Sequence, residues 1–333
     1  MEKTKLFIPQ ARVPAFALAL TLALSGLPVA HAQETPFPTR TVQIVVPYTP
    51  GTGADILARI LGPRLAERWK TGVITDNRAG ATGNIGAEFV AKAAPDGHTV
   101  LFTATSFGTT PALSANLPFD PVKSFAPVSL VATSSMSLVV HPQLPVKSLN
   151  EFIALARRQP GKLLYCSPGN GGPQHLAMEL IKLETKTDLV HTPYKGSGGA
   201  LTDLIGGHVQ AMVVSLQTVS PFVQNGRLRM LAIMGAERSP AFPNVPTLKE
   251  QNLARLEVET WYGVLAPAAT PSAAIAKINS ELHALLQLPD IREQLTRQGM
   301  NAAGGAPERL GNLVTSELTR WARVVGAAKI KAD

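Results

Sequence analysis

Short apolar runs alternate with helical patterns along most of this 333-residue chain. Several of the runs are apolar throughout, as are strands that are covered on both faces. Between them lie leucines and isoleucines at helical spacing, as in residues 56–65 and 176–183. This alternation predicts an α/β fold with mainly parallel sheets. The predicted strands are Val42–Val46, Val73–Asp76, Thr99–Thr103, Pro127–Ala132, Leu138–Val140, Leu164–Ser167, Leu189–Thr192, Gln210–Val214, Arg229–Ile233 and Gly263–Ala266.

The last third of the chain predicts amphipathic helices at Ile275–Gln287 and Leu310–Val325. Since a typical domain has about 100 to 200 residues, a chain of this length predicts two lobes. Hydrophobic residues make up 45% of the sequence and charged residues 16%, which is enough for two cores. Cys166 is the only cysteine, so no disulfide or cysteine-based metal site is expected.

Residues 1–32 have the three parts of a secretory signal peptide: a basic start, an apolar run at 13–30 and an Ala-His-Ala cleavage pattern at 30–32. A membrane anchor is the alternative, but the run contains two prolines and is shorter than the ~20 residues that a spanning helix needs. The sequence therefore predicts an exported protein that starts near Gln33 and works in the periplasm of a bacterium with two membranes.

Two turns of the same design follow apolar strands, PYTPGTGA at 47–54 and PYKGSGGA at 193–200. In each, a Pro-Tyr pair leads through glycines to an alanine and a helix. The first N–H groups of a helix are unpaired and lie at the positive end of its dipole, which suits an anion. We therefore predict paired anion clamps, one on each lobe. The candidate ligand residues are Tyr48, Thr52, Gly53, Ala54 and Asp55 in the first turn and Lys195, Ser197, Gly198 and Gly199 in the second.

A third glycine-rich turn, SPGNGGP at 167–173, also follows a predicted strand and contributes Ser167 and Asn170 as candidates. Thr105 and Ser106, just past another strand, would offer hydroxyl donors from the first lobe. Hydroxyls that bond to nearby backbone are the competing explanation for this pair.

The motifs of several enzyme classes are absent from the sequence. The first turn has no Lys-Ser/Thr ending of a nucleotide P-loop, and the glycines of Gly80–Gly86 do not have the dinucleotide spacing. There is no GxSxG elbow, and spacing identifies no nucleophile for His175 or His191, so a serine hydrolase is disfavoured but stays open. The histidines are dispersed, so no metal, cofactor or catalytic residue is predicted. A net charge of +8 arises from scattered residues and does not predict nucleic-acid binding.

Seven segments of the chain match the pattern of a known family. They are VPYTPGTGADILARIL (46–61), DNRAGATGNIGAEFVAKAAPDGHTVLF (76–102), LPFDPVKSFAPVSLVA (117–132), CSPGNGGPQHLAMEL (166–180), VHTPYKGSGGALTDLIGG (190–207), ERSPAFPNVPTLKE (237–250) and ETWYGVLAPAATP (259–271). On these segments the chain resembles the Bug family, the solute receptors of tripartite tricarboxylate transporters, and the resemblance covers nearly all of the chain after the signal peptide. It implies a type II periplasmic-binding-protein fold in which two α/β lobes are joined by two crossover strands. The lobe boundaries are expected at 33–133 with 258–333 and at 134–257.

The family's ligand loops map onto Tyr48–Ala54 and Lys195–Ala200, the two turns selected above. In the family, backbone amides hold the ligand carboxylate, partly through water, so Asp55 is interpreted as a helix-start residue more than a ligand contact. The two turn tyrosines either pack on the solute or fill the core. Ser215 stands near the cleft in a segment where many members carry an aspartate. Without that acid, an unaminated mono- or dicarboxylate is the favoured solute.

The resemblance implies a monomer that binds a small carboxylated solute by closure of its lobes and then docks on the membrane components of such a transporter. Two alternatives stay open. The closed receptor could dock on a sensor kinase, or the fold could serve a periplasmic enzyme acting on carboxylates.

Overall fold

The computed structural model describes residues 2, 4, 37–114, 116–194 and 196–330. The predicted signal peptide, apart from Glu2 and Thr4, lies outside the described residues, as do the predicted start at Gln33 and the candidate ligand residue Lys195.

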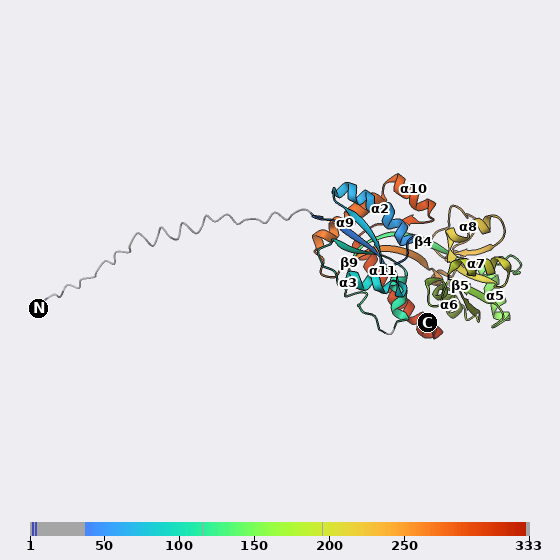
Figure 1. Cartoon of the computed structure of the whole chain (residues 1–333). Coiled ribbons are helices and arrows are strands. Elements are labelled where there is room, and N and C mark those ends of the chain that lie inside the picture. Colours follow the sequence, from blue (N-terminus) through green and yellow to red (C-terminus); the bar gives the residue numbers. More distant parts are fainter. Residues whose placement is uncertain (1, 3, 5–36, 115, 195, 331–333) are drawn as a thin grey trace. The chain divides into compact units, whose positions relative to one another are not determined.

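Ten strands of the described residues form one mixed sheet, in the order β2-β1-β3-β9-β4-β7-β5-β6, with β8 and β10 also paired to β4 (Figure 1). Parallel pairing joins β1 to β2 and β3, and β5 to β6 and β7. The strands are β1 Val42–Val46, β2 Val73–Asn77, β3 Thr99–Ala104, β4 Phe125–Val140, β5 Leu164–Ser167, β6 Val190–Pro193, β7 Ala211–Ser215, β8 Arg229–Ile233, β9 Glu259–Pro267 and β10 Asn301–Ala302.

The helices gather around the two ends of this sheet. Figure 1 shows α2, α3, α9, α10 and α11 around the end that holds β1 to β3, and α5 to α8 around the end that holds β5 to β7. The α-helices are α2 Gly53–Trp69, α3 Asn84–Ala91, α4 Ser106–Thr109, α5 Leu149–Arg158, α6 Pro173–Thr185, α7 Ser197–Gly206, α8 Leu216–Gln224, α9 Ser272–Leu286, α10 Pro289–Arg297 and α11 Pro307–Ala328. Short 3₁₀ helices occur at Ala81–Gly83, Thr110–Ala112 and Ala254–Leu256.

The α/β class is confirmed, but the prediction of mainly parallel sheets is wrong. Every pairing of β4 and β9 is antiparallel, with each other and with their other neighbours. Strands β4 and β9 lie in the middle of the sheet, between the parallel group β1 to β3 and the parallel group β5 to β7.

Strand β4 also joins two runs that the sequence pattern separates, Pro127–Ala132 and Leu138–Val140. Its Phe125–Ser135 part pairs with β9, and its Met136–Val140 part pairs with β7 and β8. The residues between the two runs are mostly Ser and Thr, which hides the strand from an apolar pattern. Ser134 and Ser137 are nevertheless fully buried, and their hydroxyls donate to the carbonyls of Gly299 at 2.9 Å and Val214 at 3.3 Å.

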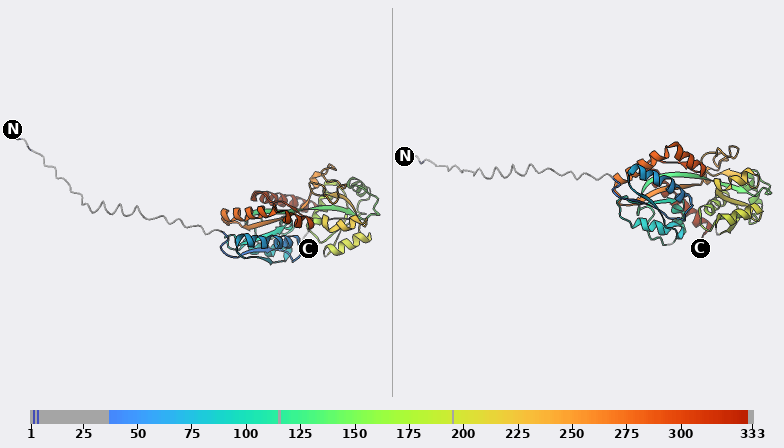
Figure 2. Two further views of the ribbon diagram at one scale, coloured as in Figure 1. Left: turned by 90° about the horizontal axis from the view of Figure 1, so that it is seen from above. Right: turned by 45° about the horizontal axis from the view of Figure 1, so that its top comes forward.

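Helices cover both faces of the sheet (Figure 2), so successive strand residues enter different cores. Ile44 and Val46 pack with α2 and α9, whereas Val45 packs with α3 and α11. Two further clusters surround β5 and β7. Helix α11 serves more than one core, since Leu310 packs beside β9 and Trp321 packs with α6. The predicted lobe boundaries stay a prediction. None of the described helices combines the length and the apolar character that crossing a bilayer requires.

Candidate ligand site

The first predicted turn leads from β1 into α2 and is braced by a buried carboxylate. Asp55, in the first turn of α2, is 3% exposed. One of its oxygens accepts from the Gly51 amide at 2.8 Å, and the other accepts from Arg59 Nε at 2.9 Å and Asn77 Nδ2 at 3.0 Å. Burial alone would raise the pKa of Asp55, but the hydrogen bonds from Arg59, Gly51 and Asn77 outweigh it and hold the pKa below its usual range. The carboxylate therefore braces the turn before α2 and does not cap the amides of the helix itself.

The start of α2 leaves backbone donors available. Thr52 is the extended N-cap residue, and its hydroxyl donates to the Thr49 carbonyl at 3.0 Å instead of capping the helix. The Ile56 amide, 2.9 Å from the Thr52 carbonyl, makes the first turn's helical bond. The amides of Gly53 and Ala54 come earlier, where a helix has no acceptor of its own. They can therefore serve an anion.

Tyr48 ties this turn to the end of β3. Its hydroxyl lies 2.9 Å from Thr103 Oγ1 and 2.6 Å from Ser106 Oγ, and it accepts from the Ala104 amide at 3.1 Å. The ring packs against the core shared with α2, and burial raises the pKa of the hydroxyl. Of the two roles considered for Tyr48, this geometry favours filling the core.

Thr105 is engaged with β9. Its hydroxyl accepts from the Trp261 amide at 2.8 Å, and its side chain is only 1% exposed. The Thr105 hydroxyl is thus paired with backbone, but with that of a distant strand and not with the nearby backbone of the competing explanation. Ser106, which is half-buried, has Tyr48 as its partner.

Tyr262, on β9, was not among the candidates. Its hydroxyl and ring edge lie against Gly53, so a Cβ atom placed on that glycine would come within 2.6 Å of the ring carbon Cζ. The side chain is 8% exposed. Its hydroxyl makes no hydrogen bond within the part of the chain that the structure describes, and it is not among the unpaired polar atoms that are fully shielded from solvent. Burial raises the pKa of Tyr262 to about 12. Tyr262 lies in segment 259–271, one of the segments that carry the family resemblance, but the local sequence does not indicate that this segment packs against the first turn.

The second turn leads from β6 into α7 and is joined to the third. The Tyr194 amide donates to the Ser167 carbonyl at 3.0 Å, and the Gly196 amide donates to the Pro168 carbonyl at 2.8 Å. Gly196 has φ 125°, which is a conformation suited to glycine. The Tyr194 hydroxyl donates to Asp203 of α7. The second and third turns thus form one hydrogen-bonded unit.

The candidates at the start of α7 are open to solvent. Ser197, Gly198 and Gly199 are exposed, and a Cβ atom on Gly198 would meet no atom within 4 Å. Asn170 in the third turn is half-buried, and so is Ser215, the N-cap residue of α8.

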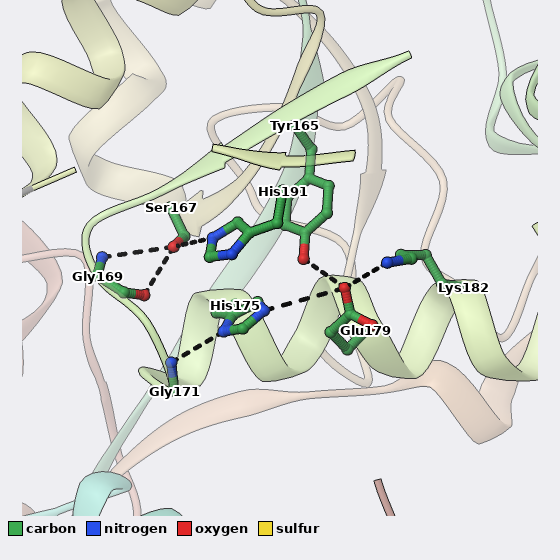
Figure 3. A network of polar contacts seen from close by, with 8 residues as sticks. All are labelled: Tyr165, Ser167, Gly169, Gly171, His175, Glu179, Lys182 and His191. Carbon is green, nitrogen blue, oxygen red and sulfur yellow. Dashed lines mark hydrogen bonds and ion pairs between the residues drawn. The ribbon is translucent and has the colours of Figure 1, made fainter. Parts of the chain in front are cut away.

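Polar side chains beneath the third turn hold it in shape (Figure 3). The Ser167 hydroxyl donates to the Gly169 carbonyl at 2.7 Å and lies 2.7 Å from His191 Nε2. His175 Nδ1 accepts from the Gly171 amide at 2.8 Å, and the two imidazole rings stack with centroids 3.8 Å apart. Sequence spacing identified no partner for His191, and the structure corrects this, since β5 and β6 pair side by side.

Glu179 of α6 closes this network. It accepts from the Tyr165 hydroxyl at 2.5 Å and from Lys182 Nζ at 2.6 Å, and it lies 3.9 Å from His175 Nε2. Ser167 is fully buried, so a substrate carbonyl has no access to its hydroxyl. The Ser167–His191 contact therefore has the geometry of a support for the turn. Among the residues that the structure describes, no group of three or more His, Cys, Asp or Glu side chains is arranged to hold a metal ion.

Comparison with known proteins identifies relatives that cover most of the chain. The family model described as "Tripartite tricarboxylate transporter family receptor", TctC, matches residues 57–330. Protein BugT of Bordetella pertussis is 33% identical over 318 residues, covering 94% of this chain and 97% of BugT. The solved structure of R. palustris Rpa4515 with adipate is 34% identical with a TM-score of 0.74, covering 89% of this chain and 99% of that one. MatC (Rpa3494) from Rhodopseudomonas palustris with bound malate is 33% identical with a TM-score of 0.71, covering 87% and 100%.

Proposed function

Because this chain belongs to the TctC family of tripartite tricarboxylate transporter receptors, we propose that it is an extracytoplasmic receptor for a small carboxylated solute. The observation that carries the proposal is the start of α2, where a buried Asp55 fixes the turn and leaves the amides of Gly53 and Ala54 for an anion. The adipate and malate in the two solved relatives support a carboxylate as that anion.

The binding mode that we propose is a clamp between the first turn and the unit formed by the second and third turns. The lobes are residues 33–133 with 258–333, and residues 134–257. Strands β4 and β9 join them and act as the hinge about which they close on the solute. The second clamp is the exposed start of α7, with Ser197, Gly198 and Gly199, and Lys195 belongs to it as well.

The solute that we propose is an unaminated mono- or dicarboxylate. The segment Val213–Ser215 lacks the acid that many family members carry there, so a ligand ammonium group would lack that counter-ion. We further propose that residues 1–32 direct export to the periplasm and that the closed receptor delivers its solute to the membrane components of a tripartite tricarboxylate transporter.

Thermal unfolding of the purified protein with adipate, malate, aspartate and nicotinate tests the proposal. A ligand present at about 100 times its Kd stabilises the folded state by about 2.7 kcal/mol, which is readily measured. We expect a dicarboxylate to raise the midpoint and aspartate to have a smaller effect. Unchanged midpoints with all four acids would refute the proposed ligand class.

A matched pair of variants locates the binding. Gly198→Val places a branched side chain in the open space at the start of α7, so we expect it to fold normally and to lose the ligand-induced shift. Gly326→Val, at an equally open position of α11, is the control and should keep the shift. Equal shifts in both variants would remove the second turn from the site.

A further inference from the structure

We propose that Tyr262 completes the anion cradle of α2 by donating its hydroxyl to one oxygen of the bound carboxylate, while the first amides of α2 bind the other oxygen. This inference rests on the proposed function, and it names a residue that sets the selectivity of the site.

The fold places Tyr262 at the start of α2. It pairs with Ala104, the last residue of β3, and β3 pairs in turn with β1, the strand that leads into the turn. The ring packs in the same core as Ala54 of the first helical turn. Its hydroxyl and ring edge lie against Gly53, which explains why the turn has a glycine there: any side chain would overlap the ring.

The hydroxyl of Tyr262 has no protein partner and is open at the edge of a buried ring. More than nine-tenths of the side chain is buried. The hydroxyl makes no hydrogen bond with another described residue, and it is not among the unpaired polar atoms that are fully shielded from solvent. Tyr48, in the turn that leads into α2, shows the contrast, because its hydroxyl lies within hydrogen-bond distance of three protein groups. A hydroxyl that is open to solvent and unpaired beside free amides is available to donate to a ligand.

The chemistry of these donors selects a carboxylate. Burial keeps the Tyr262 hydroxyl protonated at all ordinary pH values, so it donates and does not repel an anion. The nearby cation, Arg59, already bonds to Asp55 and Asn77. The cradle thus holds its ligand with neutral donors that face both carboxylate oxygens. An amide in the same place would present its NH₂ group to one of these donors, so the diamide of a bound diacid should bind poorly.

The experiment compares Tyr262→Phe with Tyr48→Phe by isothermal titration with adipate and malate and by thermal unfolding without ligand. Removing one hydrogen bond between the protein and a charged ligand group weakens binding by roughly ten- to hundredfold in Kd. We expect this loss for Tyr262→Phe, with an unchanged or higher unfolding midpoint, because no protein hydrogen bond is removed. Tyr48→Phe should instead lower the midpoint.

The outcomes are distinct. If the wild-type protein binds and Tyr262→Phe binds equally well, the inference is wrong and the proposed function stands. A Tyr262→Phe variant that weakens binding but loses stability as Tyr48→Phe does would also overturn the inference, since the hydroxyl would then have a structural role. If the wild-type protein binds neither acid and none of the four acids of the thermal screen shifts its midpoint, the proposed function is wrong, and the inference with it.

Discussion

Replacing Gly53 with alanine tests how closely β9 packs against the start of α2. The new Cβ atom would lie 2.6 Å from Cζ and 2.7 Å from Cε1 of Tyr262. Carbon atoms in contact prefer about 3.5 to 4.0 Å, so the ring must move by about 1 Å. Because 92% of the Tyr262 side chain is buried, this overpacking should cost about 1–3 kcal/mol of stability. Alanine offsets about 0.4–1 kcal/mol of that cost, because it leaves the unfolded chain less conformational freedom than glycine does.

Gly198→Ala is the matched control. Gly198 also lies in the first turn of a helix that follows a Pro-Tyr turn, but a Cβ atom there meets nothing within 4 Å. Neither glycine has a positive φ, so alanine fits both backbones. We expect Gly198→Ala to be neutral or to stabilise the protein by about 0.4–1 kcal/mol. The two variants should therefore differ by about 2 kcal/mol in the free energy of unfolding.

Urea and thermal unfolding measure this difference. For chains of about 150–250 residues, each kcal/mol moves the midpoint by about 2–4 °C, so the two variants should be separated by several degrees. A double-mutant cycle with Tyr262→Ala assigns the cause, since Gly53→Ala should cost little once the ring is gone. Equal midpoints, or an undiminished cost in the Tyr262→Ala background, would refute the packing argument.

Three further predictions concern single side chains. Since the folded-state pKa of Asp55 lies below its usual value, its stabilisation is present above about pH 4 and lost as the pH falls through the lowered pKa. Asp55→Asn should cost about 1–2 kcal/mol at pH 7 and reduce the acid sensitivity of urea unfolding; an unaltered pH profile would contradict this. Burial raises the pKa of Cys166 to about 12, so a thiol reagent should label it only after unfolding, and rapid labelling of the folded protein would disprove its burial. Tyr165→Phe removes the bond to Glu179 and should lower the unfolding free energy by about 1–3 kcal/mol, whereas an unchanged urea midpoint would show that this bond adds nothing.

Local pattern was sufficient for most strands and for the turns that follow them. The apolar run of β1 and the glycines after it predict a strand, a turn and a helix start, because each depends on residues close together in the chain. The same reasoning failed within β4, where Ser134 and Ser137 interrupt the apolar pattern. Their burial depends on carbonyl partners on distant segments, and the sequence does not reveal these.

The sequence by itself determined the α/β class, the two Pro-Tyr turns and the family resemblance, since all of these reside in short stretches of residues. Only the tertiary structure decided which side chains meet at the candidate site. Thr105 bonds to Trp261 across 156 positions of the chain, and the same antiparallel pairing of β3 with β9 sets Tyr262 against Gly53. Parallel pairing of β5 with β6 likewise brings His191 to Ser167. Such contacts follow from strand order and register, which depend on the packing of the whole sheet and not on any local pattern.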